Sequence, residues 1–68
     1  MQRVPVNSSN VRAVGYAETV LEVEFHGGSV YRYSGVPASV HASLMGAASK
    51  GRYMNMFVVN RYPTRRIR

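Results

Sequence analysis

The sequence predicts an α+β fold, in which a three-stranded antiparallel sheet is followed by two helices packed on one of its faces. Three observations predict this fold. Apolar and acidic side chains alternate along residues 19–25, as in a half-buried strand. His26-Gly27-Gly28 then supplies a hairpin turn. Residues 36–60 carry apolar side chains at helical spacing, and 68 residues leave room for one small domain.

The strands follow one another closely along the first half of the chain. Residues 1–9 show no clear period and are predicted to be an extended lead-in, after which Asn10–Tyr16 forms the first strand. The second strand is Thr19–Phe25, and the return strand after the turn is Ser29–Ser34. A three-residue loop sets a register that suits both faces of this hairpin. Its pairs are Leu21 with Tyr33, Val23 with Tyr31 and, on the solvent side, Glu22 with Arg32.

Two helices follow the strands. The first begins near Pro37, because proline is favoured at the first position of a helix, and Val40 and Leu44 continue its apolar side. Ser49 is predicted to cap the second helix, which ends at Tyr62-Pro63. Residues 10–63 therefore form a single domain, and residues 64–68 form a basic tail.

The charge of the chain restricts the kind of partner it can have. Nine basic residues against three acidic ones give a net charge of +6, which favours nucleic acid, nucleotides or an acidic protein. All three acids lie between residues 18 and 24, whereas five of the nine cations follow residue 51. No apolar run is long enough to span a membrane and no signal-peptide core is present, so we expect a cytoplasmic protein.

Side chains that could carry out catalysis are few. Ser8, Ser9, His26 and His41 are the weak candidates, but no carboxylate is placed to complete a Ser/His/Asp triad. The chain has no cysteine, and its two histidines lack the spacing of metal ligands. We therefore expect that the protein is not an enzyme and that it binds neither a metal ion nor a cofactor. Because so small a core is marginal, a homo-oligomer, most simply a dimer, is expected to add burial.

A candidate ligand site lies where the second helix begins, at Ser49-Lys50-Gly51-Arg52. The first amides of a helix are unpaired and carry partial positive charge, and two cations add to it. This pattern favours a phosphate bound by the amides of Gly51 and Arg52. The alternative is a plain serine cap with a solvated first turn. Asn55, one turn beyond Gly51, either orients the same anion or caps the edge of a strand.

Further candidates lie on the sheet and near the C-terminus. Tyr31 and Tyr33 share the face that the helices cover, so we expect them in the core, with hydroxyls that reach the rim and can contact a ligand. The alternative is that bases stack on the two rings, as they do on RNA-binding sheets. Arg61 and residues 64–68 can follow a phosphate backbone or stay solvated.

Several short motifs resemble one family. They are Ser8-Ser9-Asn10-Val11, Val14-Gly15-Tyr16, Gly28-Ser29-Val30-Tyr31-Arg32-Tyr33, Gly35-Val36-Pro37 and Ala48-Ser49-Lys50-Gly51-Arg52-Tyr53, continued by Asn55, Val58 and Tyr62. In this order they resemble the KTSC domain, a small module found at the C-terminus of some lysyl-tRNA synthetases and as stand-alone bacterial or phage proteins. Ala17 and Val59 depart from the family pattern, which often has an aspartate and a basic residue there. The resemblance implies contact with tRNA by association and carries no established activity.

Together these features predict a non-enzymatic binding protein for a phosphate-bearing, nucleotide-type ligand, acting by occupancy. One form is sequestration of a small nucleotide, such as an immune signal that a phage protein removes from the host cytoplasm. An RNA-binding module that contacts tRNA is one alternative. A protein-interaction module that inhibits an acidic partner is the other.

Overall fold

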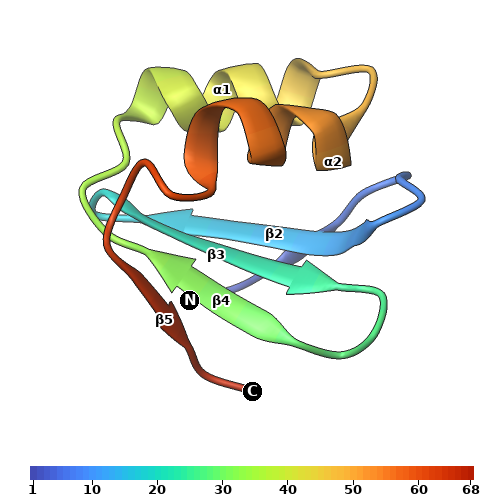
Figure 1. The fold of residues 1–68 in the computed structure, drawn as a ribbon, viewed down its shortest axis with the longest axis horizontal. Helices are drawn as coiled ribbons and strands as arrows, with labels where there is room; N and C mark the ends of the chain where they lie inside the picture. Colours follow the sequence, from blue (N-terminus) through green and yellow to red (C-terminus); the bar gives the residue numbers. More distant parts are fainter.

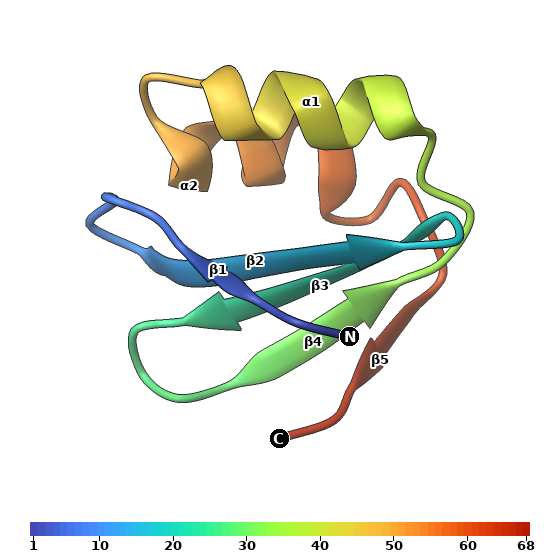
Figure 2. The same cartoon turned by 180° about the vertical axis from the view of Figure 1, so that it is seen from behind.

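The computed structural model describes all 68 residues as one layer of antiparallel strands and one layer of helices (Figure 1). Five strands are hydrogen-bonded in the order β1-β2-β3-β4-β5. Both helical segments lie over the same face of this sheet, as the view from behind also shows (Figure 2). Neither is long and apolar enough to cross a membrane. The elements are β1 (Val4–Pro5), β2 (Val11–Ala17), β3 (Val20–Phe25), β4 (Val30–Tyr33), α1 (Ala38–Gly46), α2 (Lys50–Tyr53), the π-helix η1 (Met54–Val58) and β5 (Thr64–Arg66).

The α+β class is confirmed, but the prediction of a three-stranded sheet is wrong. The lead-in contributes β1, in which Val4 lies opposite Val14 of β2. The tail contributes β5, in which Thr64 lies opposite Tyr33 of β4. Neither segment shows the alternation that marks a strand in a sequence, because each is short and exposed. Each is extended because a longer neighbouring strand offers it backbone hydrogen bonds.

The central hairpin has the predicted register. Val23 lies opposite Tyr31, and the amide of Phe25 donates a hydrogen bond to the carbonyl of Ser29 over 2.9 Å. Leu21 and Tyr33 are paired in the same way. The side chains of these residues that face the helices supply one wall of the core, so the hairpin fixes where the helices can sit.

Glu22 lies opposite Arg32 as predicted, but the expectation that it faces solvent is wrong, since it is 2% exposed. Arg32 Nε donates to one carboxylate oxygen over 2.7 Å, and Arg3 Nη1 donates to the other. Burial by itself raises the pKa of Glu22, but the hydrogen bonds and charges of Arg32 and Arg3 outweigh it and hold the pKa below its usual value. Arg3 directly precedes β1, a strand that the sequence did not predict, and it completes the set of groups that surround Glu22.

Glu24 belongs to the same face of the sheet, opposite to the helices. Its carboxylate lies 3.4 Å from Arg3 Nε and 3.1 Å from Arg68 Nη2. Only Arg3, Arg32 and Arg68 form ion pairs, which leaves six of the nine cations unpaired. Lys50 and Arg52 of α2 are among these six, so the start of the second helical segment has no acidic partner.

The second helical segment begins as predicted and changes type halfway. The hydroxyl of Ser49 accepts a hydrogen bond from the amide of Arg52 over 3.3 Å, which confirms the serine cap. From Met54 the segment is a π-helix, in which the amide of Val59 bonds to the carbonyl of Met54 over 2.8 Å. It ends earlier than predicted, because Asn60 takes a left-handed conformation with φ of 64°.

The hydrophobic core lies between the two layers. Leu21 and Val23 of the sheet meet Leu44 of α1, and all three are fully buried. The second segment contributes Met54 and Val58, one turn apart, so that its opposite side faces outward. The complete cluster is Val11, Val14, Leu21, Val23, Tyr33, Val36, Leu44, Met54 and Val58.

Candidate functional site

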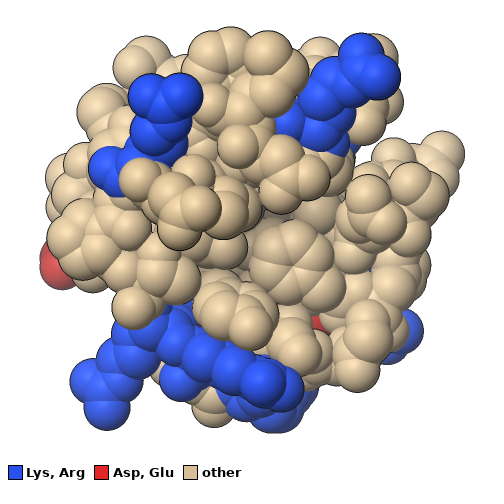
Figure 3. Space-filling model, in the orientation of Figure 1, with Lys and Arg blue, Asp and Glu red and all other residues tan.

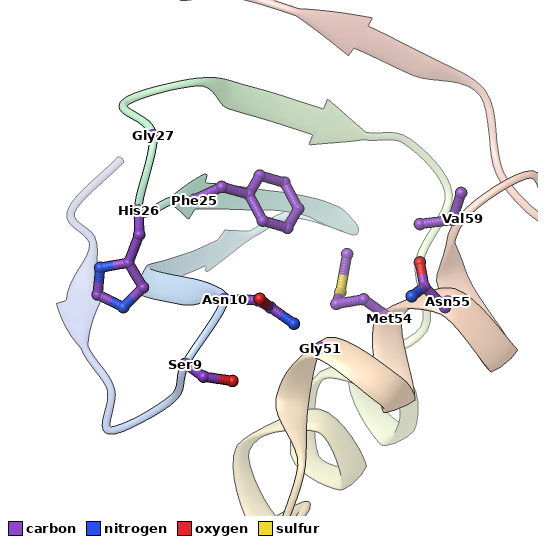
Figure 4. A pocket seen from close by; sticks show the side chains of 9 residues that line it. All are labelled: Ser9, Asn10, Phe25, His26, Gly27, Gly51, Met54, Asn55 and Val59. Atoms are coloured by element: carbon purple, nitrogen blue, oxygen red, sulfur yellow. The ribbon is translucent and has the colours of Figure 1, made fainter.

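A pocket of about 390 Å³ opens between the start of β2, the turn after β3 and the second helical segment (Figure 4). Its volume lies in the range of small-molecule sites. Asn10 and Asn55 point toward each other across Met54, and the ring of Phe25 forms a flat wall beside them (Figure 4). We call it the two-asparagine pocket. It is lined by Ser9, Asn10, Phe25, His26, Gly27, Gly51, Met54, Asn55 and Val59.

The backbone around Asn10 is fixed by short-range hydrogen bonds. The hydroxyl of Ser8 accepts from the amides of Asn10 and Val11, each over 3.3 Å. The carbonyl of Asn10 accepts from the amide of His26 over 3.0 Å, and the ring Nε2 of His26 bonds to the carbonyl of Ser8 over 2.8 Å. These contacts join the lead-in to the hairpin turn and hold one wall of the pocket in place.

Gly51 and Asn55 supply the helical wall. Gly51 is buried against Asn10, and a Cβ atom at position 51 would lie 2.5 Å from Asn10 Nδ2. Only glycine permits this approach. Asn55 is exposed and belongs to η1, whose wider turn sets the direction of its side chain. No side-chain hydrogen bond within the protein involves either carboxamide, so both are free to bind a ligand.

The predicted anion site is divided by the structure. Gly51 and Asn55 line the two-asparagine pocket, whereas Ser49 and Arg52 line a second hollow on the other side of α2. The amide of Arg52 is already bonded to Ser49, and Lys50 Nζ donates to the carbonyl of Ala47 over 3.0 Å. The expected concavity shared by the Gly51 and Arg52 amides is therefore not formed.

The two tyrosines lie where the hairpin register predicts. Tyr33 is 3% exposed in the core, and burial, followed by the nearby Tyr31, raises the pKa of its hydroxyl. Tyr31 is half-buried and meets the ring of Phe25 edge-on, with centroids 5.8 Å apart. Its other neighbour is Arg66, whose guanidinium carbon lies 5.9 Å from the ring centroid. Tyr31 therefore touches the pocket wall from behind, while Tyr33 lines neither hollow.

Arg61 is exposed and makes no ion pair, so it remains available to an anion, although it lines neither hollow. Seven of the nine lining residues were missed as ligand-binding candidates. Asn10 and Phe25 were interpreted as parts of strands, and Ser9 and His26 were considered only as weak catalytic candidates. The available signal was the polar Ser8-Ser9-Asn10 run directly before an apolar strand, which is typical of a turn with free polar groups.

Potential catalytic groups do not gather elsewhere. The ring of His41 stacks on Tyr16 with centroids 4.5 Å apart, far from the environment of His26 at the turn after β3. No three His, Cys, Asp or Glu side chains lie together as metal ligands would. The two-asparagine pocket instead presents carboxamide, hydroxyl and imidazole groups beside an aromatic ring.

Comparison with known proteins adds the family. The profile of the KTSC domain matches residues 7–62, which include the motifs noted above and the whole lining of the pocket. The crystal structure of a KTSC domain protein from Yersinia pestis has a TM-score of 0.92 to this chain and 37% sequence identity. The match covers 98% of this chain and 97% of that one.

Sequence relatives agree with this match. A protein of Stutzerimonas stutzeri, described as uncharacterized, is 46% identical over 57 residues, which are 81% of this chain and 80% of its own. A Tsukamurella paurometabola protein is 43% identical over 60 residues, 85% of this chain and 90% of its own. A lysine–tRNA ligase of Nostoc punctiforme is 45% identical over 42 residues, 62% of this chain but 8% of the ligase. The chain thus belongs to the KTSC domain family.

Proposed function

We propose that this protein is a non-enzymatic binder of a phosphate-bearing, nucleotide-type ligand, and that the ligand's base enters the two-asparagine pocket. The observation that carries the proposal is the division of chemistry around this pocket. Its lining has no charged lysine, arginine or carboxylate, whereas unpaired arginines lie just outside it. A nucleotide is divided in the same way, since its base is neutral and its phosphate is charged.

The lining suits a base. Phe25 offers an aromatic face, on which bases stack favourably. Each of the two carboxamides has an acceptor oxygen and two donor hydrogens, which match the adjacent donors and acceptors on the edge of a base. Gly51 has no side chain, so the Asn10 carboxamide can lie close against the helix at the edge of the pocket.

The cations beside the pocket suit a phosphate. Arg12 Nη2 donates to the carbonyl of His26 over 3.2 Å, which holds this guanidinium next to a residue of the pocket wall. Arg66 lies over Tyr31, which in turn touches Phe25. Lysines and arginines gather at the margins of the face seen in Figure 3 and leave its centre without basic side chains. Charge-assisted hydrogen bonds from such side chains would fix the phosphate.

The protein would act by occupancy, because no carboxylate, cysteine or lysine lines the pocket beside His26 to complete a catalytic group. Sequestration of a small nucleotide in the cytoplasm, including an immune signal removed by a phage protein, is the form we favour. The expected homo-oligomer also stays a prediction. Sedimentation velocity from micromolar concentration upward checks it, since a constant monomer mass would contradict it.

RNA is the second candidate, and β5 favours it. All three residues of this edge strand are exposed, and Arg65 and Arg66 form a basic border that a single strand of RNA could follow past the pocket. The relative in Nostoc punctiforme is a lysine–tRNA ligase, which is the class of protein that handles RNA. The third alternative from the sequence, an acidic protein partner, involves a different surface.

Titration calorimetry with nucleoside monophosphates, cyclic dinucleotides and short RNAs tests the proposal. Replacing Asn10 and Asn55 together by Ala removes hydrogen bonds worth about 0.5–1.5 kcal/mol each, so affinity for the best ligand should fall on the order of tenfold to a hundredfold. Asn7→Ala is the matched control, since this exposed asparagine lies outside the pocket. The proposal fails if no member of the panel binds, or if the double variant binds as tightly as the parent.

A further inference from the structure

A second hollow lies on the other side of α2 and shares no residue with the two-asparagine pocket. It has a volume of about 280 Å³, and we call it the helix groove. Two large apolar side chains are left in solvent along it, Met56 at 52% exposed and Phe57 at 50%. The complete lining is Ala47, Ala48, Ser49, Arg52, Tyr53, Met56 and Phe57.

The fold explains why this apolar surface is unburied. Met54 and Val58 direct one side of the second segment into the core, so Met56 and Phe57 between them point outward. Ala47 and Ala48 line the groove with small side chains, which leave its space unfilled. The rings of Tyr53 and Phe57 lie 4.8 Å apart at an angle of 41°, which makes a firm aromatic wall.

The charges around the groove indicate what fits it. Arg52 is its only charged lining residue and makes no ion pair. No acidic residue follows Glu24 in the chain, and both Glu22 and Glu24 are held by arginines on the opposite face of the sheet. Glu18 is the third acidic residue, and it makes no ion pair with Arg52, which therefore has no acidic partner within this protein. A second copy would bring another net charge of +6, which makes it a poor occupant.

We infer that the helix groove docks an acidic amphipathic segment of another protein. Its apolar side chains lie between Tyr53, Met56 and Phe57, and its carboxylates pair with Arg52. This is the arrangement in which a helix places apolar anchors in a groove and charge at its margin sets the partner. The inference is independent of the nucleotide, because the two hollows have no lining residue in common.

Fluorescence anisotropy with three labelled peptides of about 12 residues tests it, a length that holds anchors at i, i+4 and i+7. The first has Leu and Phe anchors among Glu residues, the second has Lys in place of Glu, and the third has Ser in place of the anchors. Only the first should bind the full-length protein. Phe57→Ser should lower the affinity for the first peptide on the order of tenfold. Val4→Ser, which alters an exposed apolar residue outside the groove, should leave this affinity unchanged.

Charge reversal gives a second measurement that does not depend on removing an aromatic ring. Arg52→Glu should lower the affinity for the Glu peptide on the order of tenfold and raise the affinity for the Lys peptide. The inference is overturned if no peptide binds the parent protein, or if the Lys peptide binds it as tightly as the Glu peptide does. It is also overturned if Arg52→Glu changes the affinity of neither peptide. It is also overturned if the protein sediments as a dimer that Phe57→Ser dissociates, because the groove is then occupied by a second copy.

Discussion

The backbone of Gly51 lies so close to the side chain of Asn10 that a Cβ atom at position 51 would be 2.5 Å from Asn10 Nδ2. We predict that Gly51→Ala displaces this carboxamide and weakens ligand binding about tenfold, the cost of one or two hydrogen bonds, although Asn10 itself is unchanged. Calorimetry with the best ligand of the panel measures the effect. Gly51→Val, with its larger side chain, should weaken binding further.

A double variant separates crowding from helix propensity in this prediction. In the Asn10→Ala background the added methyl group meets no carboxamide and keeps only a contact of 3.2 Å with the Cβ atom of residue 10. Because alanine also favours a helix over glycine by up to about 1 kcal/mol, Gly51→Ala should destabilise the Asn10→Ala protein less than the parent. If Gly51→Ala changes the free energy of unfolding equally in both backgrounds, the two residues are not energetically coupled.

Lys50 and Arg52 distinguish the pocket from the start of the helix as the place where the ligand binds. A phosphate at the helix start would lose two charge-assisted hydrogen bonds in the Lys50→Ala/Arg52→Ala variant, and affinity would fall a hundredfold or more. Because Lys50 bonds to Ala47 and Arg52 lines the helix groove, we predict a loss of less than about tenfold. Calorimetry decides it, and a hundredfold loss would return the site to the helix start.

The salt dependence of RNA binding tests the second candidate function. Arg61 and Arg65 are exposed and form no ion pair, so Ala can replace both without breaking an interaction that holds the fold. If RNA follows this edge, the log–log salt slope should fall by about 0.7 for each phosphate that an arginine no longer neutralises. Truncation is a poorer test, because Arg68 pairs with Glu24 and residues 64–66 form β5. An unchanged slope would exclude this path for RNA.

Because of Glu22, the free energy of unfolding should decrease at acidic pH. Its folded-state pKa lies below the usual value, so its stabilisation is complete above about pH 4.3, the pKa in an unfolded chain, and is lost as pH falls through the folded-state pKa. Glu22→Gln should lower the free energy of unfolding at pH 7 by about 1–3 kcal/mol and flatten this acid dependence. Urea denaturation measures both.

Glu18→Gln is the matched control for Glu22, because Glu18 is exposed and makes no ion pair. It should change the free energy of unfolding by less than about 0.5 kcal/mol. A Glu22→Gln protein as stable as this control across the acid range would mean that the two arginines do not depend on the carboxylate.

The hairpin was predictable because its signals are local. Alternating side chains and a glycine turn fix the pairing of Val23 with Tyr31 without help from the rest of the chain. The edge strands were not predictable, because β1 and β5 are extended by their neighbours rather than by their own residues. For the same reason the burial of Glu22 was not predictable, since Arg3 reaches it only through β1.

The candidate site was predictable only in part. Gly51 and Asn55 were identified from the helix start, but their partner Asn10 lies 41 positions before Gly51 and meets it only in the folded chain. The π-helix was the second obstacle. It begins at Met54 and was not predicted, and Asn55 lines the two-asparagine pocket while Arg52, expected to bind the same anion, lines the other hollow.

The edges of the sheet have a consequence for behaviour at high concentration. A long apolar strand with a free edge can recruit the strands of other molecules and grow into fibrils. Here β2 and β4 are each screened by a chain end: β1 is two residues long and contains Pro5, and β5 carries Arg65 and Arg66. A short strand, a proline and repelling charges are what blunt such growth. The same chain ends that complete the sheet thus protect the protein from aggregation.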